Sequence, residues 1–168
     1  EFPPQKLDLY KIESKPMVLF QAAGICKTEG NERLQKGNTG GALDKYEEGL
    51  YIMDKCAEVI TTWRLIFRQI HNEKAENDRK ERNLKYADIV EPSMPDEFRG
   101  DERDQQANRM ALLLNAAQAA LQAGKWDAVE RHATGALELD SRNVKAIYRR
   151  AMGRLGEGRK KSAEADFW

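Results

Sequence analysis

Two consecutive stretches decide the fold: residues 110–143 read MALLLNAAQAALQAGKWDAVERHATGALELDSRN, and residues 144–168 read VKAIYRRAMGRLGEGRKKSAEADFW. They align at a period of 34 residues, which places Gly124 opposite Gly158 and Val129 opposite Ala163. Within each stretch apolar residues recur at the spacing of one face of a helix. Each stretch therefore predicts two helices joined by a turn at the glycine, with small residues where neighbouring pairs stack.

A third copy lies upstream in residues 23–56, where the matching offsets hold Gly30, Gly37, Ala42, Tyr46 and Gly49. Apolar residues continue at steps of three or four as far as Ile70, so the second helix of this unit is expected to run on to about 70–83. Residues of about 71–109 carry 19 charged side chains in 39 positions, with prolines and a glycine. This insert predicts a solvated helix followed by a mobile loop around EPSMPDEFRGDE.

The three units predict an all-α chain. Their small-Gly-aromatic-small spacing resembles the tetratricopeptide-repeat family, which implies a right-handed superhelix of helix-turn-helix repeats. On that reading residues 1–22 are an extension or linker and residues 23–168 form one domain. Its parts are repeat one (23–56), the insert, repeat two (110–143) and repeat three (144–168), which is truncated. The extended helix of repeat one is similar to the repeat domains of immunophilin-like and aryl-hydrocarbon-receptor-interacting proteins.

In a stack of such pairs the first helices line the concave surface, so their outward residues decide what is bound. These residues combine cations, amides and apolar side chains without a carboxylate, which favours an anionic ligand. The polar ones that we single out as binding residues are Lys27, Asn31, Asn115, Lys145 and Arg149. The expected lining is completed by Leu34, Gln35, Leu114, Gln118, Gln122, Tyr148 and Met152.

The five polar residues resemble the motif of the carboxylate-clamp subclass of the family: Lys27-Thr28-Glu29-Gly30-Asn31, then Asn115, then Lys145-Ala146-Ile147-Tyr148-Arg149. The resemblance implies a co-chaperone module that binds the acidic C-terminal tail, of the Glu-Glu-Val-Asp type, of heat-shock proteins of the 90-kDa or 70-kDa class, and that can also meet client proteins. Lys27, Asn31 and Asn115, with Lys145, would hold the terminal aspartate, while Arg149 would reach further along the peptide. Several convergent donors suit the two carboxylates of a C-terminal aspartate.

Two alternatives stay open. The repeats could form a scaffold that binds an internal segment of a partner, or they could be the docking module of a larger peptidyl-prolyl isomerase. In each case we expect the chain itself not to be an enzyme. The sequence GNTGGA at 37–42 lacks the ending of a phosphate-binding loop, and His71 and His132 have no catalytic partner at a recognisable spacing.

The composition agrees with a module of this kind. Twenty-eight Lys and Arg balance twenty-eight Asp and Glu, so bulk charge does not favour nucleic acid or an anionic membrane. The apolar runs are far shorter than the roughly 20 residues that cross a bilayer. Two cysteines, Cys26 and Cys56, show neither a disulfide framework nor a metal motif, and no cofactor is expected. A reducing compartment, the cytoplasm with or without the nucleus, fits best.

Overall fold

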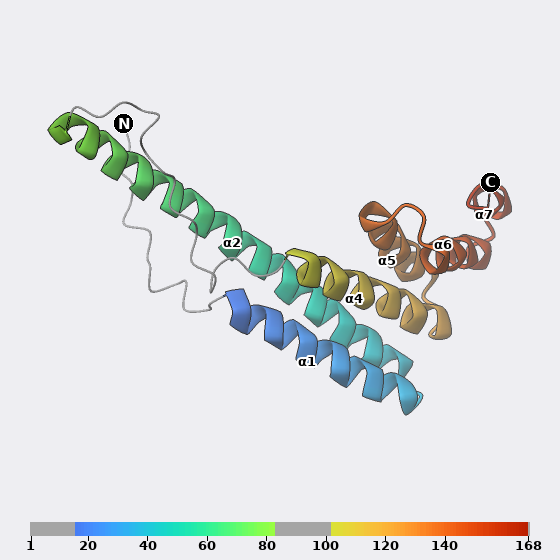
Figure 1. Ribbon diagram of the computed structural model, residues 1–168. Coiled ribbons are helices and arrows are strands. Elements are labelled where there is room, and N and C mark those ends of the chain that lie inside the picture. The colour runs from blue at the N-terminus through green and yellow to red at the C-terminus, as the bar shows by residue number, and fades with distance from the viewer. Residues whose placement is uncertain (1–15, 83–101, 168) are drawn as a thin grey trace.

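The computed structural model describes residues 16–82 and 102–167, and all regular structure in these two ranges is helical (Figure 1). The all-α fold class is therefore confirmed for this part of the chain. Its helices are α1 (Pro16–Gln35), α2 (Thr39–Arg82), α4 (Glu102–Gln122), α5 (Trp126–Leu139), α6 (Val144–Gly156) and α7 (Lys160–Glu164). Each described helix packs against the next one along the chain, including α2 against α4 across residues 83–101. Helix α4 also contacts α1 and α6.

Three turns of the same kind divide the helices into pairs. Gly37, Gly124 and Gly158 each follow a first helix and have φ angles of 75°, 69° and 78°. In each turn the next residue donates its backbone N–H to a carbonyl five positions earlier, as Lys125 does to Ala120 at 2.9 Å. This closure needs a left-handed residue, which glycine adopts without strain. The 34-residue spacing of Gly124 and Gly158 therefore corresponds to one turn geometry that occurs in both units.

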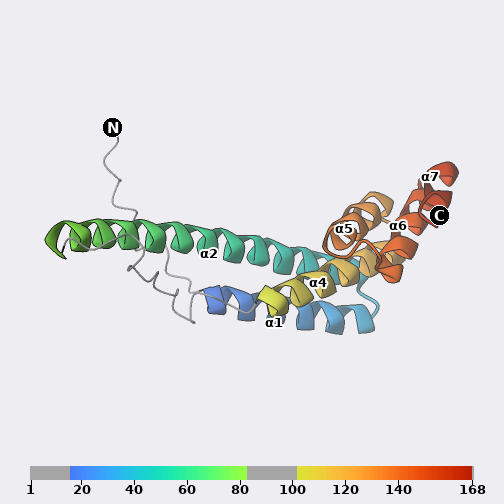
Figure 2. The ribbon, with the colours of Figure 1, turned by 45° about the horizontal axis from the view of Figure 1, so that its top comes forward.

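Helix α2 is one continuous helix over the whole stretch in which the apolar spacing predicts one. Its first part packs against α1 and α4, and its second part extends past the other helices in both views (Figures 1 and 2). Leu65 and Ile70 on this extension are more than half exposed. The predicted loop around EPSMPDEFRGDE lies outside the described residues, except for Glu102.

The start of α1 differs from the expected boundary. Residues 1–22 are predicted to be an N-terminal extension or linker, and α1, which begins at Pro16, includes the last seven of them. Proline suits the first turn of a helix because its missing N–H has no helical partner there. Pro16 is buried and its carbonyl accepts a hydrogen bond from the Cys56 thiol of α2 at 3.3 Å. Packing against α2 therefore extends the first helix by seven residues.

Helix α4 also starts earlier than expected, at Glu102 instead of residue 110. The end of the charged insert, residues 102–109, thus forms about two further turns of helix. Glu102 and Asp104 lie in the first turn, where carboxylates interact favourably with the helix dipole. Glu102 also pairs with Arg64 of α2 at 2.6 Å, and Arg109 pairs with Asp54 at 2.6 Å. The extended α2 thus provides the surface on which these additional turns of α4 pack.

The core joins the pairs through small residues and a few large ones. Tyr46, Leu43, Leu112 and Val129 are almost fully buried. Alanines 116, 117, 119 and 120 of α4 have no exposed surface, which lets α4 lie close to its neighbours. A Cβ at Gly49 would meet Leu112 at 2.9 Å, so the contact between α2 and α4 also depends on a missing side chain. Close packing of this kind keeps the first helices in fixed relative positions.

Candidate functional site

The five candidate binding residues lie on the first helix of each pair. Lys27 and Asn31 are one turn apart on α1, Asn115 is on α4, and Lys145 and Arg149 are one turn apart on α6. Because α4 contacts both α1 and α6, these three helices lie together. We call the surface that carries the five residues the first-helix face.

The first-helix face is joined across α1 and α4 by two amides. Nδ2 of Asn115 donates to Oδ1 of Asn31 at 3.0 Å, although 84 residues separate them. The hydroxyl of Tyr46 donates to the same oxygen at 2.8 Å. With its oxygen accepting twice, the Asn31 amide has one orientation, and its Nδ2 group is left to donate to a ligand.

Lys27 also contacts α4. Its Nζ donates to Oδ1 of Asn108 at 2.7 Å. The side chain of Asn108 is one of two buried polar side chains in the described core, with 7% of its surface exposed, and its Nδ2 lies 3.9 Å from the sulfur of Met53. Lys27 and Asn31 thus face Asn108 and Asn115 in the same order, so α1 and α4 run parallel.

Arg149 joins α6 to α4. Its Nε donates to Oε1 of Gln118 at 3.2 Å and its Nη1 donates to the carbonyl of Leu114 at 2.8 Å. The guanidinium is half-buried, and desolvation lowers its pKa from the usual value, although an arginine stays charged. Two of its three nitrogens are bonded to α4, so Nη2 remains as a donor.

Lys145 is the one candidate that forms no hydrogen bond to another helix within the described residues, whereas Asn31 and Asn115 bond each other and Lys27 and Arg149 bond other residues of α4. It is exposed in the first turn of α6, one turn before Arg149 and therefore on the same side of that helix. Asn143 caps this helix by accepting from the N–H of Ala146 at 3.1 Å. The cap fixes the start of α6, while the ammonium of Lys145 stays in solvent.

The lining residues predicted from the sequence fall into three groups. Leu34 and Leu114 are partly buried against the core, so they contribute packing. Gln118 bonds to Arg149 and Met152 is half-buried. The members that stay exposed are Gln35, Gln122 and Tyr148.

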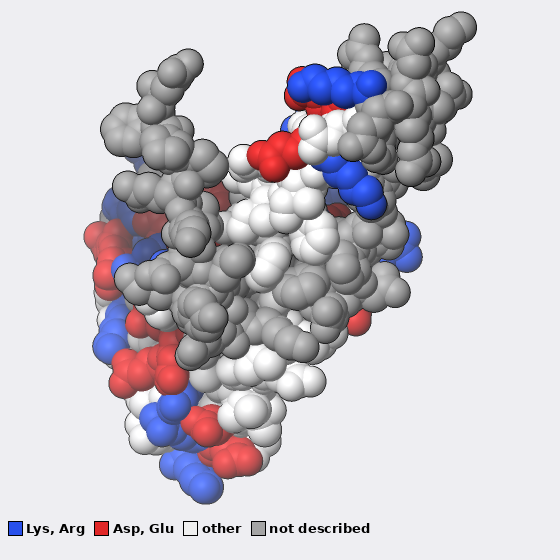
Figure 3. Space-filling view, turned by 90° about the vertical axis from the view of Figure 1, so that its left-hand side faces the viewer, with Lys and Arg blue, Asp and Glu red and all other residues white. Residues whose placement is uncertain are grey.

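Charge on the first-helix face is not neutralised within the described residues. Lys27, Lys145 and Arg149 form no ion pair there, although many other cations do, including Lys45, Arg109 and Arg150. On the face of the molecule drawn in Figure 3, blue and red side chains alternate and no broad area of one sign is visible.

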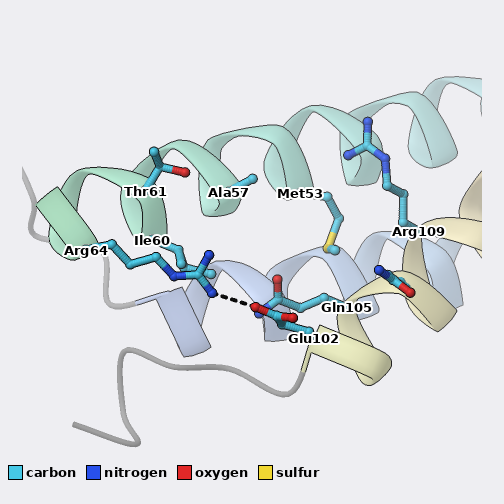
Figure 4. A pocket seen from close by; sticks show the side chains of 9 residues that line it. Met53, Ala57, Ile60, Thr61, Arg64, Glu102, Gln105 and Arg109 are labelled. Atoms are coloured by element: carbon cyan, nitrogen blue, oxygen red, sulfur yellow. Dashed lines mark hydrogen bonds and ion pairs between the residues drawn. The ribbon is translucent and has the colours of Figure 1, made fainter. Parts of the chain in front are cut away.

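A separate cavity of about 240 Å³ lies between α2 and α4 (Figure 4). Its lining includes the apolar side chains of Met53, Ala57 and Ile60 and the charged side chains of Arg64 and Arg109. Both arginines are held in the ion pairs with Glu102 and Asp54 described above. None of the five candidate binding residues lines this cavity.

Sequence reasoning did not identify Asn108, Tyr46 or the paired role of Gln118. Asn108 falls in the stretch assigned to the insert, so it carries no repeat signal. Its only signal is its position seven residues before Asn115, which places both on one face once α4 is known to start at Glu102. Tyr46 is recognisable as a packing residue, but its hydrogen bond to Asn31 depends on how α1 and α2 meet.

The other sequence features considered above lie within residues 16–82 and 102–167. These ranges contain no group of three His, Cys, Asp or Glu side chains placed to hold a metal ion. GNTGGA forms the first turn and the start of α2, where Oδ1 of Asn38 accepts from the N–H of Gly41 at 2.9 Å. His132 is buried against Glu47 between α5 and α2, with Nε2 2.9 Å from the Glu47 carboxylate.

A comparison with models of known protein families finds no match, and a comparison with curated proteins finds no similar sequence. Within the described residues, every helix is too short or too polar to cross a membrane.

Proposed function

We propose that this chain is a protein-interaction module of the tetratricopeptide-repeat type, whose first-helix face binds the acidic C-terminal tail of a partner such as a heat-shock chaperone. The observation that carries the proposal is the convergence of donors: Asn115 is bonded to Asn31 across α1 and α4, and the half-buried Arg149 is bonded to α4 without a carboxylate partner in the described residues.

The repeated turns support the tetratricopeptide reading. Three pairs of helices share one turn geometry, and first helices contact first helices, as α4 does with α1 and α6. Each pair has an apolar face that its own two helices do not cover, which is the physical reason for stacking. The second part of α2, which extends past the other helices (Figure 1), has no counterpart in the other two helix pairs.

The chemistry of a C-terminal aspartate suits these donors. It presents two carboxylates on one residue, and a recognition site needs charged donors for strength and amides for direction. Nδ2 of Asn31, the ammonium of Lys27 and Nη2 of Arg149 are such donors. A well-made hydrogen bond to a charged group contributes about 1.5–3 kcal/mol, so losing one donor should strongly weaken binding.

The test is calorimetric titration with a short peptide that ends in Glu-Glu-Val-Asp, compared with the same peptide amidated at its C-terminus. The proposal expects the acid to bind and the amide to bind at least about tenfold more weakly. Lys145→Ala and Arg149→Ala should weaken binding of the acid, whereas Lys160→Ala, an exposed lysine on α7, should leave it unchanged. Equal binding of acid and amide, or no binding of the acid to folded protein, would overturn the proposal.

The internal-segment scaffold is the second candidate, because α2 exposes Leu65 and Ile70 on its extension. A partner that uses this surface would bind equally well with a free or an amidated terminus. Leu65→Lys would then weaken binding while Arg149→Ala would not.

A further inference from the structure

Two of the candidate cations, Lys27 of α1 and Arg149 of α6, are held by uncharged groups. Lys27 donates to the amide oxygen of Asn108, and Arg149 donates to the amide oxygen of Gln118 and to the Leu114 carbonyl. Elsewhere the structure holds half-buried cations with carboxylates: Arg150 and Arg154 both bond to Asp166. Lys27 and Arg149 thus differ from Arg150 and Arg154, since their hydrogen-bond acceptors carry no charge.

Asn108 shows that this is a built feature. An amide that is nine-tenths buried needs a hydrogen-bond partner, since burying an unpaired polar group is unfavourable. Its strongest contact is the 2.7 Å bond from Lys27, and its other side faces the sulfur of Met53. An amide oxygen accepts a hydrogen bond from one of the three N–H groups of an ammonium and leaves its charge intact. A carboxylate in the same place would fix Lys27 but also neutralise it.

We propose that Asn108 and Gln118 are positioning residues, which fix Lys27 and Arg149 while leaving both charges available for the carboxylates of a ligand. This inference rests on the proposed function. The inference adds to that function a role for two neutral amides of α4, which hold the two cations in place before the ligand binds. Fixed donors bind more tightly than mobile ones because less side-chain entropy is lost on binding.

The sharpest test changes charge without changing shape. Asn108→Asp places a carboxylate next to Lys27, and Gln118→Glu places one next to Arg149, so each cation acquires an internal partner. We expect each variant to bind the acid peptide at least about tenfold more weakly than the original protein. For Gln118→Glu the midpoint of thermal unfolding should stay equal or rise, because this half-buried side chain gains an ion pair with Arg149.

The matched control is Asn72→Asp, which makes the same chemical change at an exposed position on the α2 extension. It should leave peptide affinity unchanged, which separates local neutralisation from the change in net charge. A second control is the Lys27→Met protein, in which adding Asn108→Asp should cause a much smaller further loss than it does beside Lys27. A purely structural role for Asn108 would not produce this dependence on Lys27.

The outcomes separate the two proposals. If the original protein fails to distinguish acid from amide, the proposed function and this inference both fall. If it distinguishes them but Asn108→Asp and Gln118→Glu bind as well as Asn72→Asp, only the inference is overturned. Should Asn108→Asp unfold, Gln118→Glu alone decides, because Gln118 is only half-buried and tolerates the change.

Discussion

The ring of Tyr46 fills the space that a side chain at Gly30 would need: a Cβ atom on Gly30 would lie 2.5 Å from Cε1 of that ring. The glycine in the Lys-x-x-Gly-Asn sequence of α1 is therefore required by a buried aromatic side chain of α2. The same tyrosine bonds Asn31 through its hydroxyl. One side chain thus sets both the distance between α1 and α2 and the orientation of a candidate binding residue.

Gly30→Ala should destabilise the protein because the Tyr46 ring fills the site and overpacking a core costs about 1–3 kcal/mol. Gly24→Ala is the matched control on the same helix, since nothing lies within 4 Å of a Cβ there. It should stabilise α1 by up to about 1 kcal/mol, the difference in helix propensity. Urea unfolding of both variants checks the prediction, which fails if the two are equally stable.

Tyr46→Phe should keep the packing of the ring and remove only the hydrogen bond to Asn31. We expect a loss of about 0.5–1.5 kcal/mol in the free energy of unfolding, the usual net value of one hydrogen bond. Peptide affinity should also fall several-fold, because the Asn31 amide is then held by Asn115 alone. Tyr51→Phe, an exposed tyrosine of the same helix, is the control and should change neither quantity. An unaltered Tyr46→Phe protein would show that the hydroxyl is not needed.

Repetition is the part of the fold that the sequence predicts well. The turns at Gly124 and Gly158 can be located because each requires a glycine at a positive φ. Two glycines that recur at the repeat period of 34 residues can be recognised in the sequence. The continuation of α2 as far as Ile70 follows from apolar residues at steps of three or four. Both are local signals, carried by residues near one another in the chain.

The helix ends and the partners of the binding residues depend on contacts between distant segments. The start of α4 at Glu102 does not follow from the repeat period, because packing on α2 stabilises it. Asn108 was assigned to a solvated insert for the same reason. Its burial depends on α4 being two turns longer than the repeat requires. Candidate cations can thus be predicted from spacing, but the groups that hold them cannot.

Asp166→Asn should release the end of the described chain. The Asp166 side chain is 2% exposed, and its Oδ1 accepts from Arg150 at 2.6 Å and from Arg154 at 2.7 Å. Removing one partner of a buried ion pair costs about 3–5 kcal/mol. Because this pair links only α6 to the segment after α7, the loss should be local. Hydrogen exchange of α7 amides should rise, while exchange in α1 stays unchanged.

The control for this prediction is Asp44→Asn, which removes an exposed carboxylate from α2. It should leave exchange in α7 as it is in the original protein. If Asp166→Asn also leaves α7 protected, the ion pair does not hold the end of the chain.

His132 links α5 to α2 and makes stability depend on pH. Burial is the main effect and lowers the pKa of His132, while the Glu47 carboxylate at 2.9 Å acts in the opposite direction and Arg131 and Asp127 add smaller effects. His132 therefore becomes protonated at a lower pH in the folded protein than in the unfolded chain, where a histidine has a pKa of about 6.5. Its contribution to stability is complete above that value and is lost as the pH falls towards the folded pKa.

Between about pH 7.5 and about pH 5.5 the free energy of unfolding should decrease, by at most about 1.4 kcal/mol per pH unit for one group. His132→Gln should reduce this slope, whereas His71→Gln, far out on α2, should retain it. Glu130 interferes little in this range: its hydrogen bonds with Arg159 and Arg154 lower its pKa, so its contribution is lost only in more acid solution. Urea unfolding at several pH values measures the slopes, and equal slopes for all three proteins would show that His132 does not control the acid sensitivity.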